Sequence, residues 1–127
     1  MRRERGFTLI ELLVVVVIMG ILVSMMVPRW QASREKAFVA TMKSDLRNLA
    51  SAEESYFYDY ATYTTSVPAL TTFSPSHGVT ITINESTMGG WSATATHSNT
   101  PRQCFLYTGN VSPVGGGTTV EGQVSCP

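Results

Sequence analysis

The chain has 127 residues, a formal net charge of zero and 43% hydrophobic residues, and its length suffices for one domain. Eight of the nine Lys and Arg residues fall within residues 1–47 against four acids, whereas residues 48–127 hold Arg102 alone against five acids. Phosphate binding needs a clustered basic face, so the composition disfavours nucleic acid as a direct ligand.

The first predicted element is an apolar helix over residues 7–28. An α-helix from Phe7 to Val27 spans about 32 Å, close to the roughly 30 Å of a bilayer's hydrocarbon core. A short basic flank precedes it, so the positive-inside rule predicts a cytoplasmic N-terminus and an exported remainder. The non-apolar residues of the segment and the flanking cations are Thr8, Glu11, Gly20 and Ser24, and Arg2, Arg3 and Arg5.

The residues at the two ends of this segment indicate whether it is removed as a signal peptide or retained. A secretory signal peptide is cut after the apolar run at a small-x-small pair, but the small residue there, Ser24, has Leu22 at its minus-three position. The small residue Gly6 lies instead at the near end, between the basic flank and Phe7. The sequence therefore places any cleavage before the apolar run and predicts that the run is retained.

The stretch "RGFTLIELLVVVVIMGILVSMMVP" strongly resembles the leader and N-terminal helix of type IV pilins and type II secretion pseudopilins. The matching features are the basic leader, the aliphatic block and Gly6, Phe7, Glu11, Gly20 and Pro28. This resemblance implies that a prepilin peptidase removes residues 1–6 by cutting between Gly6 and Phe7, and then methylates the new amine of Phe7. It also implies a membrane platform protein and a cytoplasmic ATPase as assembly partners.

Glu11 lies inside the apolar segment, where a charge costs roughly 3 kcal/mol on insertion scales and usually has a partner. The cleavage implied by the resemblance creates a cationic amine on Phe7 in the same apolar layer. In the family, Glu11 of one subunit is taken to pair with the Phe7 amine of a neighbour, which sets the stagger between subunits. Pairing of residues 7 and 11 within one chain is the alternative.

Gly20 and Pro28 mark the part of the helix that is easiest to loosen. Proline removes an amide hydrogen bond and clashes with the preceding turn, and glycine weakens a helix by nearly 1 kcal/mol. Because the corresponding stretch of pilin filaments can be extended, we expect residues 20–28 to be helical in the membrane and partly melted in the assembly. The alternative is a simple kink at the membrane surface.

After Pro28 the helical period resumes through residues 29–60, with one face built to be covered. That face comprises Phe38, Met42, Leu46, Leu49, Ala52 or Glu53, Tyr56 and Tyr60. Residues 61–78 are rich in Thr, Ser and Pro and indicate an irregular connection. Residues 79–127 then form the rest of an exported domain that spans residues 29–127.

Three strands are predicted in that region, at "GVTITIN", "WSATATH" and "QCFLYTG", with a turn at "MGG" and an uncertain fourth strand at "EGQVSC". The expected fold class is α+β: a long N-terminal helix packed on a small antiparallel sheet of three or four strands, the pilin fold. If the tail lies outside the cytoplasm, one disulfide between Cys104 and Cys126 is favoured, and two reduced buried thiols are the alternative. The bridge would clamp a loop that includes Gly115, Gly116 and Gly117.

No constellation of residues predicts an enzyme or a cofactor. His77 and His97 are each interpreted as loop or surface residues, since neither has metal-ligand spacing with another ligand. Calcium needs six to eight oxygens, but beyond residue 60 the acids are Glu85 and Glu121. A C-terminal calcium site marks the major pseudopilins, so its absence, with the cysteine pair, favours a pilin.

The sequence therefore predicts a structural subunit of a type IV pilus-like filament. It would wait in the inner membrane with a cytoplasmic N-terminus and then polymerise with copies of itself through its N-terminal helix. One alternative is a pseudopilin that forms a periplasmic pseudopilus for type II secretion. An alternative of another class is a single-span membrane protein whose outer domain binds a partner without polymerising.

Overall fold

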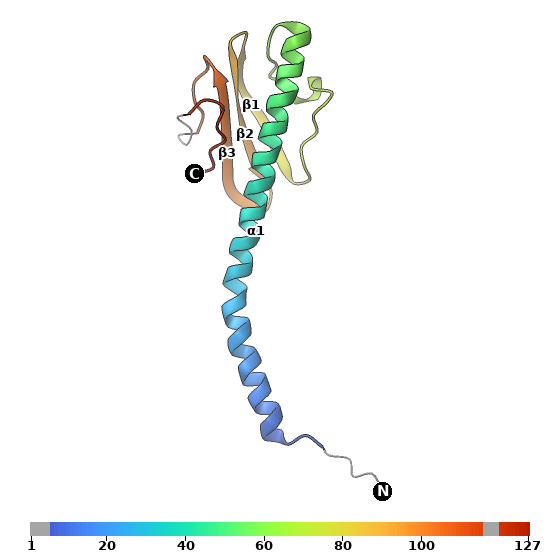
Figure 1. Ribbon diagram of the computed structural model, residues 1–127, viewed down its shortest axis with the longest axis vertical. Helices are drawn as coiled ribbons and strands as arrows, with labels where there is room; N and C mark the ends of the chain where they lie inside the picture. The colour runs from blue at the N-terminus through green and yellow to red at the C-terminus, as the bar shows by residue number, and fades with distance from the viewer. Residues whose placement is uncertain (1–5, 116–119) are drawn as a thin grey trace. The chain divides into compact units, whose positions relative to one another are not determined.

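A computed structural model describes residues 6–115 and 120–127 (Figure 1). The leader cations Arg2, Arg3 and Arg5, as well as Gly116 and Gly117 of the predicted loop, lie outside the described residues. The chain divides into two compact units, Met1–Arg34 and Glu35–Pro127.

One helix, α1, runs from Leu9 to Tyr60 and contains Pro28 in its interior. The two predicted helical stretches are therefore continuous, and residues 20–28 are helical in this structure, as expected for the unassembled chain. The helix ends where Ala61 adopts a positive φ of 54° while its amide still bonds the carbonyl of Phe57. A left-handed residue at this position turns the chain away from the helix axis.

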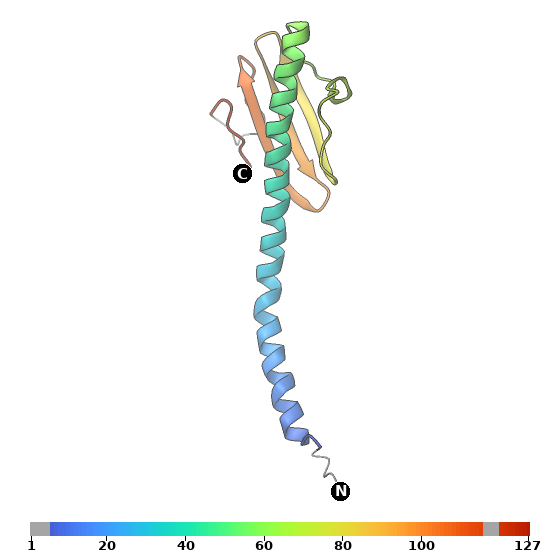
Figure 2. The ribbon, with the colours of Figure 1, turned by 45° about the vertical axis from the view of Figure 1, so that its right-hand side comes forward.

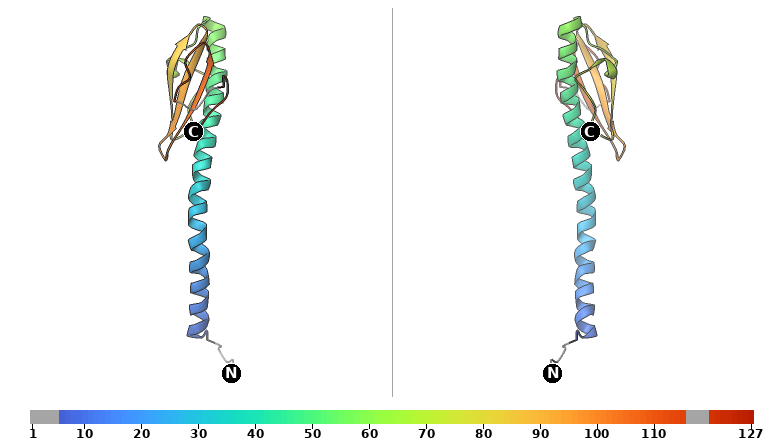
Figure 3. Two further views of the ribbon diagram at one scale, coloured as in Figure 1. Left: turned by 90° about the vertical axis from the view of Figure 1, so that its left-hand side faces the viewer. Right: turned by 90° about the vertical axis from the view of Figure 1, so that its right-hand side faces the viewer.

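Three antiparallel strands form one sheet in the order β1-β2-β3, with bounds Val79–Thr87, Gly90–His97 and Thr100–Gly109. Within the Glu35–Pro127 unit, α1 lies along one face of this sheet (Figures 2 and 3). A short 3-10 turn, η1 at Val67–Ala69, lies in the connection between helix and sheet. This arrangement confirms the α+β fold of a helix packed on a small antiparallel sheet.

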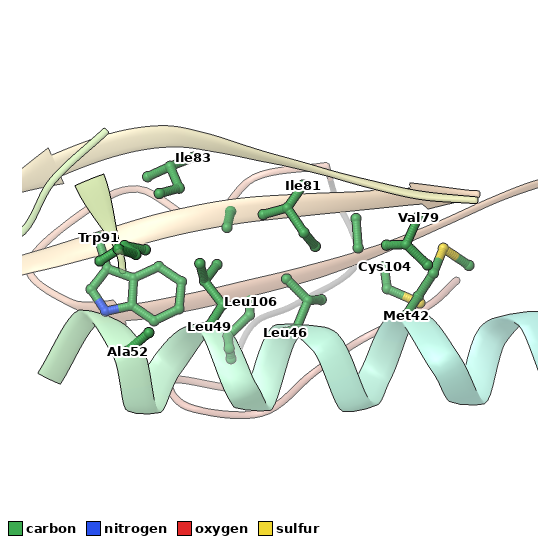
Figure 4. Close-up of a cluster of buried hydrophobic side chains, with 13 residues drawn as sticks. Met42, Leu46, Leu49, Ala52, Val79, Ile81, Ile83, Trp91, Cys104 and Leu106 are labelled. Carbon is green, nitrogen blue, oxygen red and sulfur yellow. The ribbon is translucent and has the colours of Figure 1, made fainter. Parts of the chain in front are cut away.

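The core of this unit lies between the helix and the sheet (Figure 4). Met42, Leu46 and Leu49 point from α1 toward the strands and are fully buried. From the strands, Ile81 and Trp91 contribute side chains to the same layer. Alternate residues of β1 are buried and exposed up to Ile83, as expected for a strand with one face on the core.

The first strand extends beyond its predicted end, because it continues past a β-bulge that interrupts its alternation. The register shifts between Ile83 and Glu85, which places Glu85 opposite Ser92. The extra residue, Asn84, accepts a hydrogen bond from Thr94 Oγ1 at 3.0 Å. A bulge moves the following side chains to the other face of the sheet, so an acid can follow without entering the core.

Two predictions about the domain were wrong. The uncertain fourth strand at "EGQVSC" does not form. The described part of the tail makes an isolated bridge with β3 between Ser125 and Phe105, and Gly122 N–H donates to the carbonyl of Tyr107. Gly122, with a φ of 73°, turns the tail out of an extended conformation before that bridge. Tyr60 is 64% exposed rather than covered, and its ring lies against Tyr56 at a centroid distance of 4.5 Å.

Candidate functional site

The first turn of α1 is closed by reciprocal hydrogen bonds between Thr8 and Glu11. The backbone N–H and the hydroxyl of Thr8 donate to Glu11 Oε2 at 2.9 and 2.8 Å. The backbone N–H of Glu11 lies 3.3 Å from Thr8 Oγ1, which accepts from it. This T-x-x-E arrangement is a capping box, which satisfies amides that a helix start leaves without partners.

Sequence reasoning singled out Glu11 but missed Thr8. The signal was present, because a Thr followed three residues later by Glu immediately before an apolar run is the sequence pattern of a capping box. Both bonds to the carboxylate use Oε2, and among the described residues Oε1 accepts no hydrogen bond. Glu11 is therefore held in position by its own chain while one carboxylate oxygen stays available.

The surface around Glu11 is apolar and open. Phe7 is 92% exposed, and it lines a shallow groove on the first turns of the helix together with Ile10, Glu11 and Val14. The large apolar side chains from Leu9 to Val27 are all exposed. An 18-residue window of α1 has a mean hydropathy of 2.8 and no burial inside the protein, so its length and composition permit it to cross a membrane.

Gly20 and Pro28 lie in this exposed segment, and the structure shows the local consequences of each. A Cβ added at Gly20 would meet no atom within 4 Å, so packing within the chain does not require a glycine there. Pro28 has no N–H to offer the carbonyl of Ser24. Separately, the Ser24 hydroxyl donates to the carbonyl of Ile21 at 2.7 Å. The helix is thus weakened at two positions eight residues apart without being broken.

In the C-terminal region, Cys104 and Cys126 form the favoured disulfide. Beside it, Phe105 and Ser125 exchange two backbone hydrogen bonds of 2.7 and 3.0 Å. A third attachment comes from Glu121, whose carboxylate accepts a hydrogen bond from Gly109 N–H at 2.6 Å. The described part of the tail is therefore attached to β3 both in the middle of the strand, at Cys104 and Phe105, and at its last residue, Gly109.

Three charged residues, Asp45, Glu35 and Arg102, make contacts between α1 and the rest of the unit that the sequence analysis did not predict. Asp45 is 2% exposed and accepts hydrogen bonds from the backbone and hydroxyl of Ser76, both at 2.8 Å. Glu35 pairs with Arg102 of β3 at 3.0 Å, with each side chain nearly half exposed. An exposed pair of this kind contributes little stability, so its main effect is to fix position.

Glu53 is fully buried, and its Oε2 accepts a hydrogen bond from Thr64 N–H at 3.1 Å. Its Oε1 has no partner among the described residues. Burial is the largest influence on this group and raises the pKa of Glu53, an effect that the bond from Thr64 only partly offsets. The helical period had marked position 52 or 53 as covered, and both residues are buried.

His97 is a further correction. It is 8% exposed rather than on the surface, and its ring stacks on Phe38 of α1 at a centroid distance of 4.3 Å. Its Nδ1 accepts a hydrogen bond from Asn99 N–H at 3.1 Å. His77 is exposed in the turn before β1. No group of three or more His, Cys, Asp or Glu side chains suited to a metal ion occurs within residues 6–115 and 120–127.

These features define a class of protein: one with an exposed apolar helix long enough to cross a membrane, a helix-on-sheet domain and an acid near the helix start. A family profile described as "Prokaryotic N-terminal methylation motif" matches residues 1–27. This motif, the relatives described next and the fold support the resemblance of the chain to the type IV pilin and type II secretion pseudopilin family.

The similar proteins belong to a narrower group than the fold alone indicates. The chain is similar to the type II secretion system core protein G of Klebsiella pneumoniae, with 43% identity over 70 residues, which cover 55% of this chain and 50% of the relative. For the proteins of the same description from Dickeya chrysanthemi and Escherichia coli K12, the identities are 42% and 41% over 69 and 63 residues. These matches cover 54% and 50% of this chain and 45% and 43% of the relatives, so the chain spans about half the length of the curated relatives it matches.

Proposed function

We propose that this chain is a structural subunit of a type II secretion pseudopilus, assembled from copies of itself through the N-terminal helix. The observation that carries the proposal is the exposed apolar surface from Leu9 to Val27 with Glu11 at its start. The similarity to type II secretion core proteins favours the pseudopilus over the surface pilus that the sequence alone favoured.

The proposed route begins in the inner membrane, with the N-terminus cytoplasmic and residues 29–127 outside. A prepilin peptidase cuts between Gly6 and Phe7 and methylates the Phe7 amine. Because both members of the capping box follow this cut, Thr8 continues to hold Glu11 after cleavage. The other carboxylate oxygen, Oε1, then accepts a hydrogen bond from the Phe7 amine of a neighbouring subunit, and both charges lose their cost in the apolar layer.

Assembly transfers apolar helices from lipid into the filament, where they pack against one another. Lipid is as apolar as these side chains, so van der Waals packing and the Glu11 pair must supply the driving force. A membrane platform protein and a cytoplasmic ATPase are the proposed assembly partners. We propose no catalytic activity, cofactor or metal for this chain.

A surface pilus remains the second candidate, and a specific observation favours it. The C-terminal tail is closed by the disulfide between Cys104 and Cys126, and its described part carries one acid, Glu121, which already bonds Gly109. A calcium site requires more oxygen ligands than this. The tail therefore departs from the calcium-bound form that marks the major pseudopilins.

The two functions are separated in a strain that lacks the chromosomal copy and is complemented with the wild-type chain. A pseudopilus subunit restores the release of secreted proteins into the medium and gives no long fibres in electron micrographs of sheared cell surfaces. Long surface fibres that contain the chain, with secretion unaffected by its loss, would replace this proposal with the pilus. An N-terminus that stays uncut at Gly6 beside an active peptidase would point to the non-polymerising membrane protein.

A further inference from the structure

An uncharged stretch of α1 is bounded by one charged residue at each end. Residues 12–28 contain no Asp, Glu, Lys or Arg, whereas Glu11 precedes them and Arg29 follows them. These two charged positions are about 27 Å apart along an α-helix, close to the roughly 30 Å of a bilayer's hydrocarbon core. The helix can therefore cross the hydrocarbon with both charges at its boundaries, where a charge costs less than at the centre.

Trp30 lies directly after the second of these charges and has an exposed ring. Its side chain is 66% exposed, so the indole is not part of a core. Helical side chains lean toward the N-terminus, so the indole leans toward the apolar segment. The shallow groove at this point of the helix is lined by Val23, Met26, Val27, Trp30, Gln31 and Arg34. The indole thus lies where the helix surface changes from apolar to polar.

An indole suits the boundary between hydrocarbon and lipid headgroups. Most of the ring is apolar, while its N–H donates a hydrogen bond to water or to a lipid carbonyl. Trp and Tyr are for this reason enriched where membrane-spanning helices leave the hydrocarbon, and such residues help to set how a helix sits in the bilayer. Within residues 1–34, Trp30 is the only residue of either type, so this unit has one candidate for an aromatic anchor.

We propose that Trp30 anchors α1 at the outer lipid–water interface of the inner membrane and thereby sets the depth of Glu11. The inference rests on the membrane location in the proposed function. With the indole at that interface, residues 12–28 fill the hydrocarbon, and Glu11 lies about 28 Å further in, at the inner boundary. The bond between Gly6 and Phe7 then falls on the cytoplasmic side of that boundary.

This depth is connected with the pairing of subunits. Movement of a helix out of the membrane carries Glu11 from the boundary into the hydrocarbon, where an unpaired charge is costly. The same movement takes the indole away from the interface. A neighbouring Phe7 amine removes the first of these costs, so a paired subunit leaves its resting depth more readily than an unpaired one.

The depth of Trp30 is measured by fluorescence quenching. The full chain is placed in phosphatidylcholine vesicles whose acyl chains carry bromine near the glycerol, at the middle or at the end. Bromine quenches nearby indoles, so the three lipids report depth. Trp91 is 1% exposed inside the other unit, and a Trp30→Phe variant gives its background signal. We expect the strongest quenching of Trp30 by bromine near the glycerol.

A second indole measures the depth of the helix itself. Ile21 is exposed and lies beside the midpoint of residues 12–28. In the Ile21→Trp/Trp30→Tyr chain, tyrosine keeps an aromatic anchor, and bromine at the end of the acyl chains should quench most strongly. The matched Ile21→Trp/Trp30→Gln chain lacks the anchor, so its preference for the deepest bromine should be weaker.

The outcomes separate the anchor from the proposed function. If the tyrosine chain shows no preference for the deepest bromine, the membrane location is overturned, and the anchor with it. If that preference is present but Trp30 is not quenched most strongly near the glycerol, the anchor alone is overturned. Equal profiles of the tyrosine and glutamine chains would likewise show that Trp30 does not set the depth.

Discussion

The two carboxylate oxygens of Glu11 have different surroundings. Its own chain fixes Oε2 through Thr8, and the apolar surroundings leave Oε1 without a partner among the described residues. A carboxylate that is rigidly held and half satisfied binds a cation at lower entropic cost than a mobile one. The capping box therefore prepares Glu11 for the proposed contact with a neighbouring Phe7 amine.

Replacing Glu11 with Val should abolish filament formation while leaving cleavage at Gly6 intact. The substitution removes the acceptor for the neighbouring amine but keeps the helix apolar. Filament yield is measured by electron microscopy of sheared or overexpressing cells, and cleavage by the mass of the N-terminal peptide. A normal yield of filaments from the Glu11→Val chain would rule out the pairing.

Glu53 predicts a dependence of stability on pH. Because burial raises its pKa in the folded chain, the folded state holds the proton more tightly than the unfolded state. Stability is therefore greatest below the ordinary glutamate pKa and falls as pH rises through the raised value. Glu53→Gln removes the charge and keeps an acceptor for Thr64 N–H.

We expect the melting temperature of Glu53→Gln, relative to wild type, to be higher at about pH 7 than at about pH 4. Thermal unfolding of the full chain in detergent, followed by circular dichroism, measures this difference. Glu85→Gln supplies a matched control, since it removes one negative charge from an exposed strand residue. A Glu53→Gln advantage that is the same at both pH values would show that the buried charge is not its cause.

At the scale of elements, α1 is continuous but contains two residues that lower the stability of a helix. Gly20 and Pro28 lie in a helix that the structure shows intact from Leu9 to Tyr60. Neither residue is required by contacts in the chain, because a Cβ fits at Gly20 and Pro28 only removes a hydrogen bond. We therefore infer that Gly20 and Pro28 act in the assembled filament, where we expect residues 20–28 to melt partly.

Gly20→Ala and Pro28→Ala should each raise the helicity of the membrane form and lower filament yield. The gain in helix stability is about 1 kcal/mol for the first and about 3 kcal/mol for the second, so the loss of filaments should be greater for Pro28→Ala. Helicity is measured by circular dichroism in micelles and yield by electron microscopy. If both variants assemble normally, melting is not part of assembly, and a simple kink becomes the better description of residues 20–28.

At the scale of the molecule, the Glu35–Pro127 unit buries one helix face against three strands, and the disulfide fastens its tail to β3. The two cysteines are separated by 22 residues. Closing such a loop restricts the unfolded chain more than the folded one, which stabilises the fold by about 3 kcal/mol. So small a core makes that contribution a large part of the total.

The Cys104→Ser/Cys126→Ser variant should therefore unfold at lower urea concentration than the oxidised wild type. The expected loss is about 3 kcal/mol of unfolding free energy, from urea titrations of the full chain in detergent. Wild type under reducing conditions is the matched control and should behave like the variant. An unfolding midpoint that neither reduction nor substitution changes would mean that the other tail contacts suffice.

Much of this protein was determined by local sequence. The capping pattern at Thr8 and Glu11, the apolar run to Val27 and the helical period through Leu49 each depend on neighbours a few residues away. Local periodicity therefore predicted α1 and its buried face, and the alternation of Val79, Ile81 and Ile83 predicted β1 up to its bulge. The disulfide followed from the expected compartment and the count of two cysteines.

The tertiary structure decided what depends on residues distant in sequence. Asp45 is polar, yet it is buried because Ser76 satisfies its carboxylate across the connection. His97 is buried because Phe38 of α1 covers its ring, and Glu85 stays exposed because a bulge shifts the register at Asn84. Burial of a polar group depends on whether folding supplies a partner, and no local pattern carries that information.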